Sequence, residues 1–288
     1  GKMSEGLSPA TLTTIGAAAG IVEVFVCQPL VACKNALQDS RPLPRAPREF
    51  YRGVVINSTS FAPITAVQFG VNRFMEKMIL GSGEGGKKKM TSVEKVVAST
   101  IAGAASGLVS GPAELVMIQQ QKNKTKLMEQ ASLLMREHGI GIFARGLIPN
   151  MTREAIYTVG YLGLCPIFYG ALSSTETFKE NKGAAYVVSG IAAGMCSSTS
   201  SQPADTIKTR LQSNIGQTAE KDGYKNIRST VGTMYKEGGV GIFWSGIAPR
   251  MARLVLAVFV LAGCKDFMTA KAEDFYGIER SAGGDEDE

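Results

Sequence analysis

Residues 200–212, SSQPADTIKTRLQ, decide the fold of this chain. The segment follows an apolar run, yet it carries Pro203, Asp205 and Lys208. A proline inside a helix removes one backbone hydrogen bond and bends the helix, so both charges are expected just past a kink, one turn apart. Charges near the end of an apolar span are costly unless opposite charges on neighbouring helices meet them. The segment therefore predicts charged partners elsewhere in the chain.

The same pattern occurs three times. A proline opens each of the segments PLVACKNALQ, PAELVMIQQQ and PADTIKTRLQ, with a glutamine nine residues after it and a glycine nine residues before it. An aromatic-x-x-glycine step and a second apolar run follow each segment. Four spaced features that coincide in three places indicate an internal repeat. The predicted helix kinks lie at Pro29, Pro112 and Pro203, and the matching glutamines are Gln38, Gln121 and Gln212.

Long apolar runs favour a membrane protein over a soluble helical repeat. Residues 12–33 contain one charge, Glu23, and residues 184–204 contain none. Such runs approach the roughly 20 residues that cross a bilayer core. The runs that follow them are shorter or interrupted by glycine and proline, which is typical of helices that also line a wet cavity.

Composition excludes several other classes. The net charge is +6, but no basic stripe with interleaved aromatic residues is present, so we expect no nucleic-acid binding and attribute the charge to loops and to attraction of anionic lipids or solutes. The 5 cysteines show no ligand spacing, and neither a nucleophile–base pair nor a phosphate-binding loop is present. We therefore expect no enzyme, catalytic residue, metal ion or cofactor.

On these residues the chain resembles the mitochondrial carrier family, which includes the ADP/ATP translocase, over residues 8–272. The family signature is Pro-x-acid-x-x-base, three times, and this chain is an atypical match because its first and second copies are degenerate. The resemblance implies an all-α membrane protein of six transmembrane helices in three pseudo-threefold repeats, with a short matrix-side surface helix in each.

The resemblance also implies the division of the single carrier domain, residues 1–288. The repeats would span 8–80, 92–175 and 183–272, and the surface helices would fall near 43–50, 127–138 and 224–237. The acidic tail, 273–288, is expected to be disordered.

In the family, the acid of each copy pairs with the base of the next and closes the matrix side. The implied matrix-gate pairs are Glu114 with Lys208, Asp205 with Lys34, and Val31 with Met117. Both members of the third pair are apolar. Losing one member would leave a buried charge unpaired at a cost of about 3–5 kcal/mol, whereas losing both leaves an apolar contact. We therefore expect a gate with two ion pairs.

The three glutamines match the family's gate braces, where an amide bonds across an ion pair. Gln38 has no acid in its own copy, which argues against a brace at that position. The opposite gate is weaker, because Arg73, Glu76 and Asp266 are its only candidate charges.

Family solutes bind midway, on even-numbered helices. Distances from each aromatic-x-x-glycine step give the candidate substrate-binding residues Ser60, Ile64, Gln68, Arg153, Glu154 and Arg253. Arginine holds a carboxylate by forked hydrogen bonds, and Glu154 could take an ammonium group. Similar carriers with arginine followed by an acid on helix 4 tend to carry amino acids. Two alternatives stay open: Arg153 and Glu154 pair with each other structurally, and Glu23 lines the cavity or bonds a neighbouring helix.

The sequence thus predicts a mitochondrial inner-membrane carrier that exchanges small carboxylates or amino acids by alternating access. Its partners would be a small anionic or zwitterionic solute and a membrane lipid such as cardiolipin. The alternative is a carrier-derived structural subunit of a larger inner-membrane complex, motivated by the degenerate outer gate and the missing first acid. A peroxisomal or plastid membrane is the alternative location.

Overall fold

The chain is helical throughout the part that the structure describes. This computed structural model describes residues 9–80, 91–179, 181–216 and 220–276, and no strand occurs among them. Six long segments alternate with short helices and turns. The long segments are α1 (Pro9–Gln38), α3 (Val54–Leu80), α4 (Ser92–Asn123), α6 (Leu147–Val159) continued through a π turn into α7 (Cys165–Ser173), α9 (Lys182–Ser213) and α12 (Ile247–Tyr276).

The long segments form a closed ring. Each packs on the next in chain order, α1 on α3, α3 on α4, α4 on α6, α6 and α7 on α9, and α9 on α12, and α12 returns to pack on α1. Because the ring is closed, side chains that point inward from any segment can meet across it.

Within the described residues, four helical stretches are long and apolar enough to cross a membrane: Thr14–Gln38, Pro47–Ile79, Val93–Asn123 and Val240–Ala272. α9 has the length but not the apolarity, because it buries serines, threonines and charged side chains along one half. These polar groups are hidden inside the ring rather than exposed, so α9 is compatible with the all-α membrane fold that the sequence predicted.

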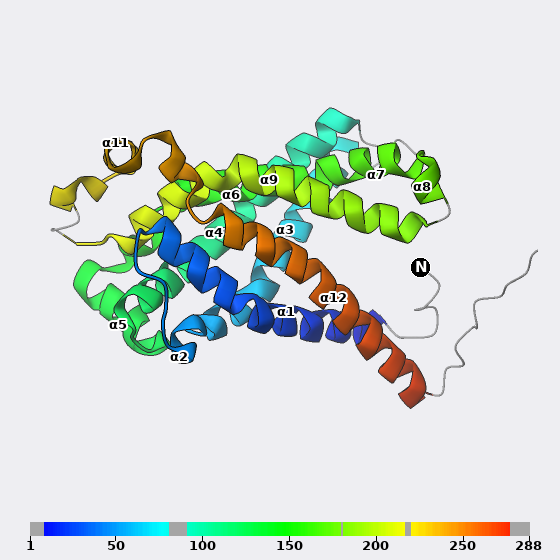
Figure 1. Ribbon diagram of the computed structural model, residues 1–288, viewed down its shortest axis with the longest axis horizontal. Helices are drawn as coiled ribbons and strands as arrows, with labels where there is room; N and C mark the ends of the chain where they lie inside the picture. Colours follow the sequence, from blue (N-terminus) through cyan, green and yellow to red (C-terminus); the bar gives the residue numbers. More distant parts are fainter. Residues whose placement is uncertain (1–8, 81–90, 180, 217–219, 277–288) are drawn as a thin grey trace, which may run out of the picture.

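The short helices gather at one end of the ring (Figure 1). They are α2 (Pro47–Phe50), α5 (Leu127–His138) and α11 (Ile227–Gly238), whereas α8 (Glu176–Lys179) lies at the other end. α5 and α11 lie at two of the three positions where surface helices were expected. The remaining one, α2, is shorter than the expected 43–50, because the proline-rich loop before Pro47 has few backbone donors. Short 3₁₀ turns, Ile140–Ala144 and Val240–Trp244, lead from α5 and α11 into the next long segments.

The three signature prolines lie inside helices, as predicted: Pro29 in α1, Pro112 in α4 and Pro203 in α9. Proline also explains the π turn Gly160–Leu164. Pro166 has no N–H, so the carbonyl four residues earlier loses its helical donor just where the turn occurs.

Glycines bring α4 and α6 into close contact. A Cβ built on Gly103 would lie 2.6 Å from the Glu154 carbonyl oxygen, and one on Gly107 would lie 2.8 Å from the Cα of Met151. Any larger residue would push the helices apart, which agrees with the small-residue spacing in the sequence. This contact fixes the position of the first turns of α6, which carry Arg153 and Glu154.

At the C-terminal end the structure corrects one boundary. α12 continues to Tyr276, so the first residues of the predicted disordered tail are helical. The remainder, residues 277–288, lies outside the described residues. The predicted repeat limits, 8–80, 92–175 and 183–272, stay a prediction.

Candidate functional site

Asp205 of α9 is the centre of a buried group of charges. Its side chain is fully buried, and Lys34 Nζ and Gln38 Nε2 donate to its Oδ2 at 2.9 and 2.8 Å. An isolated carboxylate in such a place would be strongly destabilising, so the surrounding positive charges offset the loss of water. The cations within 4 Å of its oxygens are Lys34, Arg153, Lys208 and Arg250.

Glu114 of α4 connects this centre to α6. Its Oε2 contacts Lys208 Nζ, and its Oε1 accepts a hydrogen bond of 2.6 Å from Arg153 Nη2. Arg153 in turn bonds Glu154 Oε1 at 2.5 Å and Asn150 Oδ1 at 3.1 Å. The seven charged residues joined in this way will be called the axial network: Lys34, Glu114, Arg153, Glu154, Asp205, Lys208 and Arg250.

Both ion pairs implied for the matrix gate are present as contacts, Glu114 with Lys208 and Asp205 with Lys34. The apolar third pair is buried, with Val31 6% and Met117 5% exposed. Met117 packs against the backbone of Gly53. A Cβ built on Gly53 would lie 2.5 Å from the Cγ of Met117, and the φ of Gly53 is +85°. Whether these contacts act as a gate stays a prediction.

Arg153, predicted to bind the solute, contacts the acids of the matrix gate as well. The sequence assigned it to the solute and assigned Glu114 and Asp205 to the gate, but the structure joins all three. Its pairing with Glu154, the structural alternative, is also present. One guanidinium therefore connects the candidate solute residues with the candidate gate residues.

The three glutamines behave differently from one another. Gln38 Nε2 donates to Asp205, and its Oε1 accepts from Thr209 Oγ1 at 2.8 Å, so its amide contacts the acid of the Lys34–Asp205 pair. The acid that Gln38 lacks in its own copy is thus supplied by α9, and its role as a brace stays a prediction. Gln121 and Gln212 instead donate to backbone carbonyls, of Arg52 and of Gly111 and Arg145 respectively.

The other candidate solute residues lie outside the axial network. Arg253 Nη2 lies 3.2 Å from Glu23 Oε1, and its side chain is 40% exposed. Gln68 Nε2 donates to Thr158 Oγ1 at 2.8 Å, and Ser60 Oγ donates to the Ile56 carbonyl at 2.6 Å. Ile64 is half-buried. The structure thus presents two separate charged groups, the axial network and the Glu23–Arg253 pair.

Two contributors were missing from the sequence prediction. Arg250 contacts Asp205 and donates to Gln202 Oε1 and Ser201 Oγ, both at 2.8 Å. Asn150 accepts from Arg153. Each precedes a predicted arginine by three residues, which places it on the same helix face, so helical spacing could have found both.

The last turn of α9 forms a second polar group at the short-helix end. Its backbone carbonyls lack helical donors and are bonded from other segments instead. Arg145 donates to the Leu211 carbonyl at 2.8 Å, and Gln119 and Lys122 donate to the Ser213 carbonyl at 2.8 and 3.0 Å. These contacts connect the end of α9 to α4 and to the turn before α6.

Tyr224 supports this group from the loop after α9. Burial raises the pKa of its phenol to about 12, so the hydroxyl stays protonated at physiological pH. It donates to Glu237 Oε1 at 2.6 Å and accepts from Arg210 Nη1 at 3.3 Å.

The charges at the opposite end differ from the axial network. Arg73, Glu76 and Asp266, the candidates for the second gate, are exposed. No ion pair joins any of them within the described residues.

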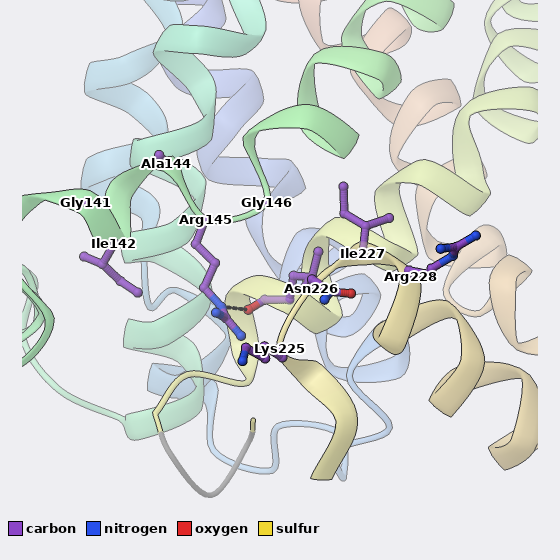
Figure 2. A pocket seen from close by; sticks show the side chains of 10 residues that line it. Gly141, Ile142, Ala144, Arg145, Gly146, Lys225, Asn226, Ile227 and Arg228 are labelled. Carbon is purple, nitrogen blue, oxygen red and sulfur yellow. Dashed lines mark hydrogen bonds between the residues drawn. The ribbon is translucent and has the colours of Figure 1, made fainter. Parts of the chain in front are cut away.

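A cavity of about 660 Å³ lies between the 3₁₀ turn after α5 and the start of α11 (Figure 2). Arg145, Lys225 and Arg228 line it, whereas none of the candidate solute residues does. This cavity is therefore distinct from the axial network.

Comparisons with known proteins agree with this architecture. The sequence profile of the family described as "Mitochondrial carrier protein" matches residues 88–174 and 179–274. The chain is 28% identical to a probable mitochondrial 2-oxodicarboxylate carrier of Dictyostelium discoideum, covering 83% of each chain. It is also 28% identical to mitochondrial citrate transporter A of Aspergillus niger, covering 86% of this chain and 88% of the relative. Identity to mitochondrial glutamate carrier 1 of Rattus norvegicus is 24%, with 79% and 78% covered.

Proposed function

Because this chain belongs to the mitochondrial carrier family, whose members are transporters, we propose that it exchanges small carboxylates or amino acids across the mitochondrial inner membrane by alternating access. The relatives are named for a 2-oxodicarboxylate, for citrate and for glutamate, all of which are small carboxylates. These relatives are named for different solutes, so the choice of solute depends on residues of this chain.

The observation that carries the proposal is the set of partly exposed charges on α6 and α12. The side chains of Arg153, Glu154 and Arg253 are 15%, 14% and 40% exposed, and Arg253 stands on one of the stretches that are apolar enough to cross a membrane. Ionisable groups at such depth are rare and mark solute pathways. The two arginines can bind a carboxylate by paired hydrogen bonds, and Glu154 can bind an ammonium group.

Alternating access is supported by the difference between the two ends of the ring. At one end the axial network joins α1, α4, α6, α9 and α12 by ion pairs, whereas at the other end the charged side chains are exposed. A carrier needs two gates that open in turn around a central site. We infer from this difference that the protein is closed at the short-helix end in this conformation.

We expect Arg253→Ala to slow solute exchange about tenfold or more, because a hydrogen bond to a charged group contributes about 1.5–3 kcal/mol. The assay is uptake of radiolabelled amino acids and di- or tricarboxylates into liposomes preloaded with the same solute. Arg153→Ala should have the same effect, but it also removes three ion pairs of the axial network, with Glu114, Glu154 and Asp205, so its thermal stability is measured in parallel. Arg136→Ala, on the exposed face of α5, is the control.

A folded wild-type protein that exchanges none of these solutes would contradict the transport proposal. The alternative, a carrier-derived structural subunit, would then be favoured. One predicted gate pair is apolar, and Arg73, Glu76 and Asp266 make no ion pair among the described residues. Co-purification with a larger inner-membrane complex would support that alternative. Immunolocalisation separates the inner membrane from a peroxisomal or plastid membrane.

The cavity beside α11 supports a lipid partner such as cardiolipin. It is lined by three cations and by the start of a helix, which together favour bound phosphate. We expect the double variant Lys225→Gln/Arg228→Gln to lose about half of the thermal stabilisation that cardiolipin gives the detergent-solubilised protein. Lys236→Gln, exposed on the same helix, is the matched control, and equal stabilisation of all three proteins would exclude this site.

A further inference from the structure

We propose that Glu23 determines the charge of the solute, so that the site is matched to one net negative charge, as in an acidic amino acid, rather than to the two of a dicarboxylate. This inference rests on the proposed function. Glu23 is not one of the candidate substrate-binding residues predicted from the sequence.

Glu23 stands in the middle of an otherwise uncharged stretch of α1. Its side chain is 3% exposed, and its Oε1 lies 3.2 Å from Arg253 Nη2 on α12, the helix that packs beside α1. A carboxylate at the centre of a membrane span is unfavourable by about 2.5–3.5 kcal/mol. Its partner Arg253 is much more exposed, at 40%, so one member of this pair is buried while the other remains partly accessible.

The charges of the two groups can be counted. The axial network contains the cations Lys34, Arg153, Lys208 and Arg250 and the acids Glu114, Glu154 and Asp205. Its formal charge is therefore one positive. The Glu23–Arg253 pair is formally neutral. Without Glu23, these two groups together would carry two formal positive charges in place of one.

This count predicts solute charge because most of the side chains that carry these charges are largely buried. A solute whose charge equals and opposes that of the site leaves no uncompensated charge, whereas an excess on either side is penalised more strongly there than in water. Glu23 thus acts through Arg253 and is a positioning residue. A solute carboxylate would approach the exposed part of the Arg253 side chain, which is 40% exposed, while its Nη2 stays 3.2 Å from Glu23 Oε1.

The two solutes for the test have the same carbon skeleton. Glutamate carries one net negative charge at neutral pH, and 2-oxoglutarate, with a keto group in place of the ammonium group, carries two. We expect the wild-type protein to exchange glutamate in preference to 2-oxoglutarate. Glu23→Gln should move the ratio of the two rates towards 2-oxoglutarate by about tenfold, as expected for one charge in a partly screened site.

Glu23→Asp is the matched control, because it keeps the negative charge and should keep the wild-type preference. A purely structural role for Glu23 would lower both rates by one factor and leave the ratio unchanged. An unchanged ratio in Glu23→Gln, or a wild-type preference for 2-oxoglutarate, would overturn the inference.

Binding is measured separately, as thermal stabilisation of the detergent-solubilised protein by each solute. The inference about Glu23 holds if glutamate stabilises the wild-type protein more than 2-oxoglutarate does and Glu23→Gln reverses this order. It then holds even where liposomes show no exchange. In that case the transport proposal alone fails. If neither solute stabilises or exchanges, both proposals fail.

Discussion

Asp205→Asn is expected to abolish solute exchange and to lower the free energy of unfolding by about 3–5 kcal/mol. The carboxylate is fully buried, receives hydrogen bonds from Lys34 and Gln38, and has three further cations within 4 Å. Asparagine keeps the size but removes the charge, so these cations would face one another without the acid that they share. Uptake into liposomes and thermal unfolding in detergent measure the two effects.

Glu176→Gln is the control for Asp205→Asn, because Glu176 is an exposed acid on the short helix α8, outside both candidate gates, without an ion pair in the described part of the chain. It should leave both exchange and stability near the wild-type values. Asp205→Glu keeps the charge and should retain most of the stability. If Asp205→Asn unfolds at the wild-type temperature, the axial network does not stabilise this conformation.

Val31→Asp and Met117→Lys are each expected to destabilise the protein by about 3 kcal/mol or more, because each buries a charge without a partner. The double variant should recover about 1–3 kcal/mol of that loss if the two positions face each other, as the third gate pair requires. Unfolding of the wild-type protein, the two single variants and the double variant gives the coupling free energy directly.

Val31→Asn and Met117→Gln provide the matched cycle without charges. They change packing by a similar amount but cannot form an ion pair, so their coupling should be near zero. Strictly additive effects in the charged cycle would mean that Val31 and Met117 do not oppose each other, and the implied threefold closure would then be wrong at this position.

The spacing after proline, a local pattern that is repeated, identified Glu114 and Asp205 as the acids, and the resemblance to the family implied their partners Lys208 and Lys34. Local spacing could not provide an acid for Gln38, since Gln38 bonds an acid on another helix and its own segment carries no trace of that acid. Arg153 was recognised as important but not as a contact of both gate acids, because local spacing does not show how far a long side chain reaches across the ring. Glu23 was left open between two roles for the same reason.

The polar character of α9 has a consequence for how the protein is made. A helix is released into a bilayer on its own only when its side chains favour lipid, and each charged residue near its centre opposes this by about 2.5–3.5 kcal/mol. α9 carries Asp205 and Lys208 among many buried serines and threonines, and it is absent from the four stretches that are apolar enough to span unaided. Its insertion is therefore expected to be assisted by helices already in place, among them α1 and α4, which carry its partners Lys34 and Glu114. Unlike α12, which is among those four stretches, α9 becomes a membrane segment only as part of the assembly, and the order of synthesis supplies its partners first.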